Sequence, residues 1–327
     1  MNMNTEPESS KGASSSVEDY ISYRPLLFSL AYRMLGSVMD AEDVVQEAFI
    51  YVNVKRPEHI TSMKAYLCKI VTNRCIDLLR SSRKQREVYV GTWLPEPLVP
   101  DAARSFAEPD DRYLQKESIS TAYLLLLQQL SWVERAVFLL REVLQYEYDE
   151  IAEIVGKSST NCRQIFRRAK LAISQIPEQD DALKSSLQTT PIEQQQPLKP
   201  PAVEKTSTIV EQFVQAIMSG NMGQLLSVVR ADAVLYSDGG GKVKAAIRPI
   251  LGAERIAAYF FGLLAKLPQD YTYVLSEVNG ETGIVGYDGD GQPNNVHSFE
   301  IADGQISSFY IVVNPDKLRH IAAASER

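Results

Sequence analysis

Proline-containing segments divide this chain of 327 residues into separate folding units. Three prolines fall within residues 95–100, and residues 177–204 are rich in Gln and Pro. Proline removes a backbone N–H and its ring clashes with the preceding turn, so residues 95–100 cannot continue a helix. The composition of residues 177–204 is typical of a tether. At about 100–200 residues per domain, the sequence predicts two or three domains joined by a linker over 89–116, which is also acidic, and a tether over 177–204.

The two blocks before the tether have helical periodicity. In residues 18–88, apolar side chains recur every three or four positions from Tyr23 to Leu35, as on a buried helix face. Gly36 is predicted to end that helix, Asp40 to cap the next, and residues 63–81 to form a third. Residues 117–176 are predicted to be helical again. Residues 1–17 are polar and are predicted to be a disordered tail.

The block over 205–314 is different. Two predicted helices open it, and residues 253–267 form another. Five strand-like runs bounded by Gly, Asp or Asn fill most of the rest. Helices followed by strands indicate an α+β domain, with a curved antiparallel sheet wrapped on helices. Residues 315–327 are predicted to be a short C-terminal tail. The fold class is therefore multidomain, with two all-α units before an α+β unit.

Charge is distributed unevenly along the chain. The formal net charge is −7, yet residues 157–170 hold five basic side chains and no acid, and residues 73–86 hold five against one acid. Two basic islands in an acidic chain indicate two places that hold a polyanion. The start lacks an apolar signal-peptide core, and no apolar run reaches the roughly 18 residues of a membrane span. The three cysteines form no CxxC pair and are expected in the core, which fits a reducing cytoplasm. We expect no metal and no cofactor.

Residues 148–170 have the pattern of a helix-turn-helix. A short helix is predicted to stop at Gly156, and Ser158 is a good N-cap for the next helix, which buries Cys162, Ile165 and Phe166. The second helix of this motif enters the DNA major groove, where Arg and Gln suit guanine and adenine edges. The alternative is an amphipathic pair with a solvated charged face. The candidate DNA-binding residues of this helix are Thr160, Asn161, Arg163, Gln164, Arg167 and Arg168.

The helix over 63–81 carries a second polar stripe. Asn73, Asp77, Arg80 and Lys84 are spaced so that they line one face. Asn and Asp can pair with exposed base edges while Arg and Lys hold phosphates, but such a stripe is equally consistent with a solvated face. Arg74 and His59 complete this group of candidate DNA contacts.

An acidic cluster marks the helix after Gly36. It is either a source of helix-dipole stabilisation or a docking surface for a basic partner protein. Its acidic members are Asp40, Glu42, Asp43 and Glu47, and the neutral Gln46 beside them is a further candidate contact.

Two blocks resemble a known family. The segment from YRPLLFSLAYRMLGSVMDAEDVVQEAFI to SMKAYLCKIVTNRCIDLLRS is similar to region 2 of bacterial extracytoplasmic-function (ECF) sigma factors, and residues 130–170 are similar to their region 4. The resemblance implies a specificity subunit of RNA polymerase. It also implies that the acidic cluster docks on the polymerase clamp helices. The helix of Asn73 and Asp77, with residues 55–62, would melt the −10 element, and the helix of Arg163 would contact the −35 duplex.

The last block resembles the SnoaL-like fold, and a sigma factor carrying such a domain belongs to a recognisable subgroup. WLPEPL, DGGGK and NPDKL look like signatures of that subgroup. The leading hypothesis is that the domain regulates the sigma regions in cis, in place of a separate anti-sigma protein. The candidate regulatory contacts are Trp93, Pro95, Glu96, Pro97, Asp238, Gly239, Gly240, Gly241, Lys242, Asn314, Pro315, Asp316, Lys317 and Leu318.

The DGGGK run is not a phosphate-binding P-loop. With Gly241 and Lys242 in the last places of that motif, Tyr236 would replace its first glycine and Val243 its Ser or Thr. We expect a contact loop to the sigma core, with a simple tight hairpin as the alternative. Since no acid–base pair is visible, we expect no enzyme activity. A small-molecule ligand stays an alternative, with these candidate pocket walls: Tyr236, Tyr273, Tyr287 and His297.

Two alternatives to a sigma factor are kept. One is a helix-turn-helix activator with a ligand-sensing domain, which would bind duplex DNA without polymerase. The other is an enzyme fused to a DNA-binding module, which would show turnover in residues 205–327. The leading hypothesis has core RNA polymerase and promoter DNA as partners, and no membrane.

Overall fold

The computed structural model describes residues 11–55, 60, 62–82, 88–100, 119–174 and 201–324. The predicted contacts His59 and Lys84 lie outside these residues, as do most of the acidic linker and the tether up to Pro200. In the described part, no helix is long and apolar enough to cross a membrane. Its three cysteines are free and buried, as predicted.

Helices make up the first two blocks. Before the linker the structure has α1 (Lys11–Leu35), α2 (Val38–Lys55) and α3 (Met63–Ser81). After it come α6 (Thr121–Gln128), α7 (Trp132–Phe138), a π-helical turn η1 (Leu139–Val143), α8 (Tyr148–Val155) and α9 (Ser159–Ser174).

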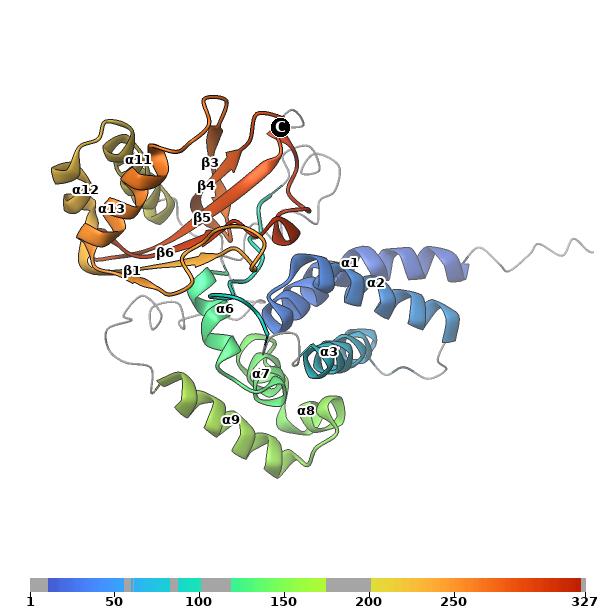
Figure 1. Ribbon diagram of the computed structural model, residues 1–327. Coiled ribbons are helices and arrows are strands. Elements are labelled where there is room, and N and C mark those ends of the chain that lie inside the picture. Colours follow the sequence, from blue (N-terminus) through green and yellow to red (C-terminus); the bar gives the residue numbers. More distant parts are fainter. Residues whose placement is uncertain are drawn as a thin grey trace, which may run out of the picture.

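The two helical blocks share one hydrophobic core, although the sequence predicted separate units. Leu27 and Leu67 of the first block and Leu139 and Ile151 of the second are fully buried in the same cluster. The guanidinium of Arg135, on α7, is buried and donates to the carbonyl of Met34 on α1. This packing holds the helix-turn-helix against α3 (Figure 1).

Two helices begin earlier in the chain than the sequence indicated. The structure starts α1 at Lys11, within the predicted tail over 1–17, and α11 at Pro201, within the predicted tether. Proline is tolerated at the first position of a helix.

The C-terminal domain is a six-stranded curved sheet with helices on one face. Its elements are α11 (Pro201–Met218), α12 (Met222–Val228), β1 (Val229–Asp238), β2 (Ile250–Leu251), α13 (Ala253–Leu264), β3 (Thr272–Val278), β4 (Glu281–Tyr287), β5 (Pro293–Ala302), β6 (Gln305–Val312) and the 3-10 turn η3 (Pro315–Lys317). The strand order is β2-β1-β6-β5-β4-β3. The five predicted strands are present, and β2 was missed.

The sheet is mixed rather than wholly antiparallel, because β1 pairs with β6 in parallel. The first strand of the domain lies beside the last, so the chain between them returns through α13 and the hairpins instead of one tight turn.

Each face of the sheet has its own apolar core. One face packs on α11, α12 and α13 through residues such as Phe213, Phe260 and Phe309. The other face, which includes Tyr287 and Val312, packs on Leu94 of the linker and Ala122 of α6. Figure 1 shows the sheet between these two layers. The C-terminal domain therefore covers the linker and the start of the second helical block.

Candidate nucleic-acid interface and linker clasp

The helix-turn-helix has the geometry that the sequence predicted. Gly156 ends α8 in the left-handed conformation with φ 66°, which glycine adopts without strain. The hydroxyl of Ser158 accepts from the backbone N–H of Asn161 at 3.3 Å, which caps α9. Cys162 and Ile165 are buried, and Phe166 packs between Phe138 and Tyr148.

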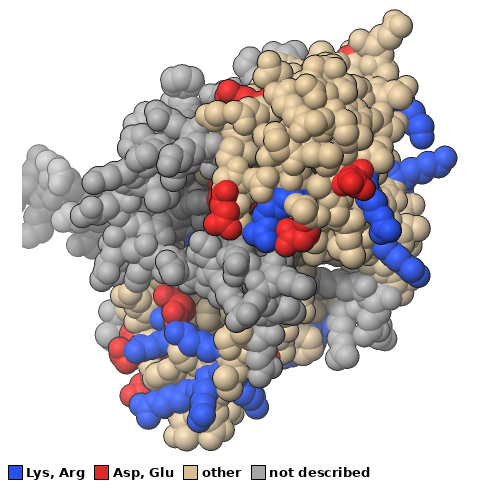
Figure 2. Space-filling model, turned by 90° about the vertical axis from the view of Figure 1, so that its left-hand side faces the viewer, with Lys and Arg blue, Asp and Glu red and all other residues tan. Residues whose placement is uncertain are grey.

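The six predicted DNA contacts of α9 lie on its exposed side. They are Thr160, Asn161, Arg163, Gln164, Arg167 and Arg168. Figure 2 shows Lys and Arg side chains gathered at the lower end of the molecule, at the height of α9 in Figure 1. Two of these arginines also have contacts inside the molecule, one within the motif and one with α7. Arg163 lies over the ring of Tyr148 at 5.3 Å, and the Nε of Arg168 is 3.6 Å from a carboxylate oxygen of Glu134. The surface is ordered, basic and open to solvent.

The stripe on α3 is partly engaged inside the molecule. The amide nitrogen of Asn73 donates to the carbonyl of Ile154, on α8, at 3.3 Å. Asp77 and Arg80 form an exposed ion pair at 3.4 Å, and Arg74 pairs with Glu47 at 2.9 Å. Asn73 is exposed, and one of its amide N–H groups bonds the helix-turn-helix.

The acidic cluster on α2 faces solvent. Asp40, Glu42, Asp43, Gln46 and Glu47 are all exposed, whereas Val44, Val45, Ala48 and Phe49 of the same helix are buried. One local prediction was wrong: Asp40 lies inside the first turn, and its backbone N–H is bonded by the hydroxyl of Ser37 at 3.1 Å.

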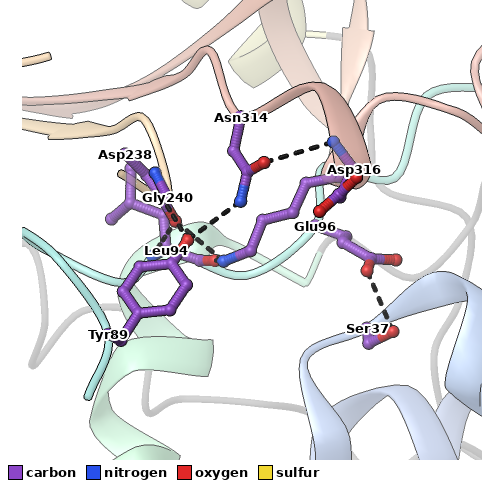
Figure 3. A network of polar contacts seen from close by, with 9 residues as sticks. Ser37, Tyr89, Leu94, Glu96, Asp238, Gly240, Asn314 and Asp316 are labelled. Atoms are coloured by element: carbon purple, nitrogen blue, oxygen red, sulfur yellow. Dashed lines mark hydrogen bonds and ion pairs between the residues drawn. The ribbon is translucent and has the colours of Figure 1, made fainter. Parts of the chain in front are cut away.

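The predicted regulatory motifs meet at one place, which we call the linker clasp. We define it by Tyr89, Trp93, Leu94, Asp238, Asn314 and Lys317. Figure 3 shows Asp238, Tyr89, Leu94 and Asn314 converging from the linker, the end of β1 and the turn after β6.

Asp238 is the centre of the clasp and is fully buried. Its carboxylate accepts from the hydroxyl of Tyr89 at 2.5 Å, the backbone N–H of Leu94 at 2.8 Å and the Nζ of Lys317 at 2.7 Å. The backbone N–H of Gly240 donates to it as well, at 3.0 Å. Four donors around one carboxylate compensate its removal from water.

Lys317 completes the clasp from the C-terminal side. Its ammonium group also donates to the carbonyl of Leu94 and lies 4.0 Å from the centre of the Trp93 ring, at cation–π distance. Burial and the adjacent Asp238 raise the pKa of Tyr89, so its hydroxyl keeps its proton and donates. Asn314 donates in turn to that hydroxyl at 3.0 Å.

The remaining members of the motifs surround the clasp. Lys242 and Asp316 form an ion pair at the surface, and the Asn314 side chain lies against Gly240. A Cβ on Gly36 would approach Trp93 to 2.8 Å and Pro95 to 3.4 Å, so the glycine lets the linker lie directly on the α1–α2 turn.

Sequence reasoning missed Tyr89, an aromatic side chain at the start of the linker, and His320, which bonds the carbonyl of Pro97 at 2.8 Å.

A second join lies between the sheet and α6. Asn279 bonds both backbone groups of Leu98, accepts from the N–H of Ile119 at 3.1 Å and donates to the hydroxyl of Tyr32 at 2.8 Å. Beside it, Thr121 and Ser298 are joined through their hydroxyls at 2.9 Å.

Two carboxyl groups face α6 at this join. Glu300 accepts from the backbone N–H of Ala122 at 3.4 Å and from Ser120. The β4–β5 register continues to Glu281 beside Glu300. Burial raises the pKa of Glu281 to about 7. Burial and the charge of Glu281 together raise the pKa of Glu300 to about 8. The sequence analysis identified neither residue. The one feature that could have indicated them is an acidic residue at a position where the strand pattern expects an apolar one.

The four candidate pocket residues do not line one cavity. Tyr236 and Tyr287 lie in the cluster that faces the linker, while His297 packs near Phe260 on the helical face. The pairing of Tyr273 with Gly286 puts its side chain opposite to that of Tyr287. Burial of the imidazole lowers the pKa of His297 to about 4, which favours the neutral ring beside Phe260.

A basic helix-turn-helix that shares a core with an acidic-faced helical unit, both joined to an α+β domain, defines a class of DNA-binding transcription proteins. Two family models match the helical blocks of this chain. Residues 20–85 match the model of Sigma-70 region 2, and residues 120–173 match that of Sigma-70, region 4.

Relatives match beyond these regions. The ECF RNA polymerase sigma factor SigJ of Mycobacterium tuberculosis is 28% identical over 310 residues, covering 92% of each chain. The ECF sigma factor SigW of Bacillus subtilis is 31% identical over 144 residues, covering 41% of this chain and 73% of SigW. The crystal structure of M. tuberculosis SigJ superposes with a TM-score of 0.68 at 25% identity, over 92% of this chain and 97% of that one.

The chain belongs to the ECF sigma factors, so it is a transcription initiation factor of RNA polymerase. The SigJ match extends through the C-terminal domain, and the predicted fold class, two all-α sigma domains followed by an α+β domain, is confirmed. We keep the name SnoaL-like domain for this α+β domain, after the resemblance noted in the sequence.

Proposed function

We propose that the SnoaL-like domain regulates this sigma factor in cis, by holding region 2, the linker and region 4 in one closed arrangement. The observation that carries the proposal is the linker clasp, in which buried Asp238 and Lys317 grip Leu94 from both sides. The shared core of the two helical blocks supports it as well.

Three surfaces of the sigma regions have proposed roles. The exposed side of α9 contacts the −35 duplex, with Arg and Gln at base edges and the remaining basic groups at phosphates. The stripe on α3 contacts the melted −10 strand. The acidic cluster on α2 binds core polymerase through complementary charge.

Closure competes with promoter binding. Asn73 is exposed, but one of its amide N–H groups donates to the carbonyl of Ile154 at 3.3 Å, so in the closed arrangement that N–H is not available to a base. Two promoter elements on one duplex also require the two DNA-binding surfaces to stand apart, which the shared core opposes. Because the SnoaL-like domain is tethered, its effective concentration is in the millimolar range, and a modest contact is enough to bias the equilibrium.

Run-off transcription with core polymerase tests the proposal. The double variant Asp238→Asn/Lys317→Met opens the clasp without leaving one buried charge, and Lys242→Ala is the control at the exposed pair of the same loops. We expect transcript yield per bound polymerase to change several-fold in the double variant and to stay at the wild-type level in the control. Equal yields, with exchange measurements showing a released linker, would refute cis regulation while leaving sigma activity itself intact.

A further inference from the structure

Glu96 lies two residues beyond the clasped Leu94 and contacts the start of α2. One of its carboxylate oxygens accepts from the backbone N–H of Val38 at 2.7 Å and from that of Met39 at 3.2 Å. The other accepts from the hydroxyl of Ser37 at 3.0 Å. Figure 3 shows this contact beside the clasp. The linker thus satisfies backbone donors that a helix leaves unpaired at its first turn.

The backbone around Glu96 is held as firmly as its side chain. Its N–H donates to the carbonyl of Gly36 at 2.8 Å, and its own carbonyl accepts from the hydroxyl of Tyr32 at 2.7 Å. Glu96 is also buried. Such a cap supplied from a distant segment exists only while the linker stays in place.

The capped turn leads directly into the acidic cluster. The hydroxyl of Ser37, which donates to Glu96, accepts from the N–H of Asp40. Asp40 lies in this first turn, Glu42 and Asp43 follow it, and all three face solvent. A carboxylate near a helix N-terminus is favourable through the helix dipole, and capping prevents fraying of that turn. The direction in which the first acidic side chains point therefore depends on Glu96.

We propose that Glu96 is a positioning residue for polymerase binding: it orders the first turn of α2, and the clasp on Leu94 holds it there. Docking of the SnoaL-like domain thereby orders the proposed polymerase-binding surface, because the clasp holds Leu94 and Glu96 caps α2. This inference rests on the proposed binding of core polymerase by α2.

Hydrogen exchange of the full chain tests the cap without polymerase. In Glu96→Ala, we expect exchange in the peptide over residues 36–42 to become about tenfold faster, with peptides of α3 and α9 unchanged. Glu96→Gln keeps an acceptor oxygen and should lie between Ala and wild type. Glu254→Gln, which changes an exposed glutamate in the first turn of α13, is the matched control and should change nothing at α2.

A second pair of measurements tests the coupling. Lys317→Ala should speed exchange in both the linker and residues 36–42, and Glu96→Ala should weaken binding to core polymerase by about tenfold. Unchanged exchange at α2 in Lys317→Ala, or unchanged or tighter polymerase binding in Glu96→Ala, would overturn the inference. If instead the wild-type chain does not bind core polymerase, the proposed role of α2 fails, which is a separate result.

Discussion

The SnoaL-like domain presents a buried carboxylate at each of two contacts with the sigma regions, and the two carboxylates differ in their partners. Asp238 receives four donors, one of them the ammonium group of Lys317. Glu300 accepts a hydrogen bond from the side chain of Ser120 and a long one from the backbone N–H of Ala122. Its neighbour is another acid, Glu281. Burial alone does not decide how a carboxylate behaves, because the charge of its neighbours sets which protonation state is stable.

The two contacts should therefore respond to different perturbations. In the clasp the charge of Asp238 is compensated by Lys317, so its stability should depend on that lysine. At the α6 contact two carboxyl groups lie together without a cation from α6, so its stability should depend on pH. The sequence of α6, TAYLLLLQ, has no basic side chain to compensate the pair.

Removing the lysine should have the largest effect. Lys317→Ala leaves Asp238 buried with no cation, and breaking a buried ion pair from one side costs about 3–5 kcal/mol. We expect a loss of that order in the free energy of unfolding of the SnoaL-like domain and linker, measured by chemical denaturation. A double-mutant cycle with Asp238→Asn should recover much of it. A loss below about 1 kcal/mol would mean that the clasp is open in solution.

Raising the pH should loosen the α6 contact next. In a separated state both glutamates would titrate near their ordinary value of 4.5, but when docked they keep protons to about pH 7 and 8. The docked state therefore binds more protons between pH 4.5 and 8, so docking is favoured at the acidic end and weakens as pH rises through that window.

Exchange at the backbone N–H of Ile119 and Ala122 reports this contact. Between pH 6 and 8 we expect the docked fraction to fall relative to the open fraction by at least about tenfold, after correction for intrinsic exchange rates. Glu300→Gln should flatten this dependence and stabilise docking at pH 8. The same slope in the variant as in wild type would contradict the assignment to the acid pair.

A glycine substitution should weaken the clasp less. Gly240 has φ 59°, and a Cβ there would meet the Asn314 side chain at 2.3 Å. Gly240→Ala combines strain in the left-handed region with displacement of Asn314, and we expect a loss of about 1–2 kcal/mol in unfolding free energy. Gly304→Ala has a similar φ of 78° but meets nothing within 4 Å, so it measures the strain by itself. Equal losses in the two variants would show that Asn314 does not matter.

The surface pair beside the clasp should matter least. Lys242 and Asp316 are 53% and 37% exposed, compared with 8% and 0% for Lys317 and Asp238. Exposed pairs contribute about 0–1 kcal/mol, so Lys242→Ala should leave unfolding nearly unchanged, with an even smaller effect in high salt. A loss as large as that of Lys317→Ala would reverse our ranking of the two pairs.

Local sequence patterns predicted the elements of the helix-turn-helix and of the sheet. Gly156 ends a helix, Ser158 caps the next one, and the spacing of Cys162 and Ile165 defines its buried face. Each of these effects depends only on residues nearby in the sequence, so they can be predicted without knowing the tertiary structure. The parallel pairing of β1 with β6 was not predicted, because nothing in a strand's own pattern specifies which edge it joins. The role of Ser37 in place of Asp40 was missed for a related reason: the start of α2 is set partly by Glu96, which is distant in sequence.

The sequence by itself determined most of the helices and five of the six strands, which side of α9 is basic and where the three motifs proposed as regulatory occur. Periodicity, capping and charge are properties of neighbouring residues. Only the tertiary structure decided that Lys317 compensates Asp238, that Glu281 lies beside Glu300 and that the linker caps α2. These pairs are joined by packing of the sheet against the sigma regions, and burial makes their charges matter because water no longer screens them.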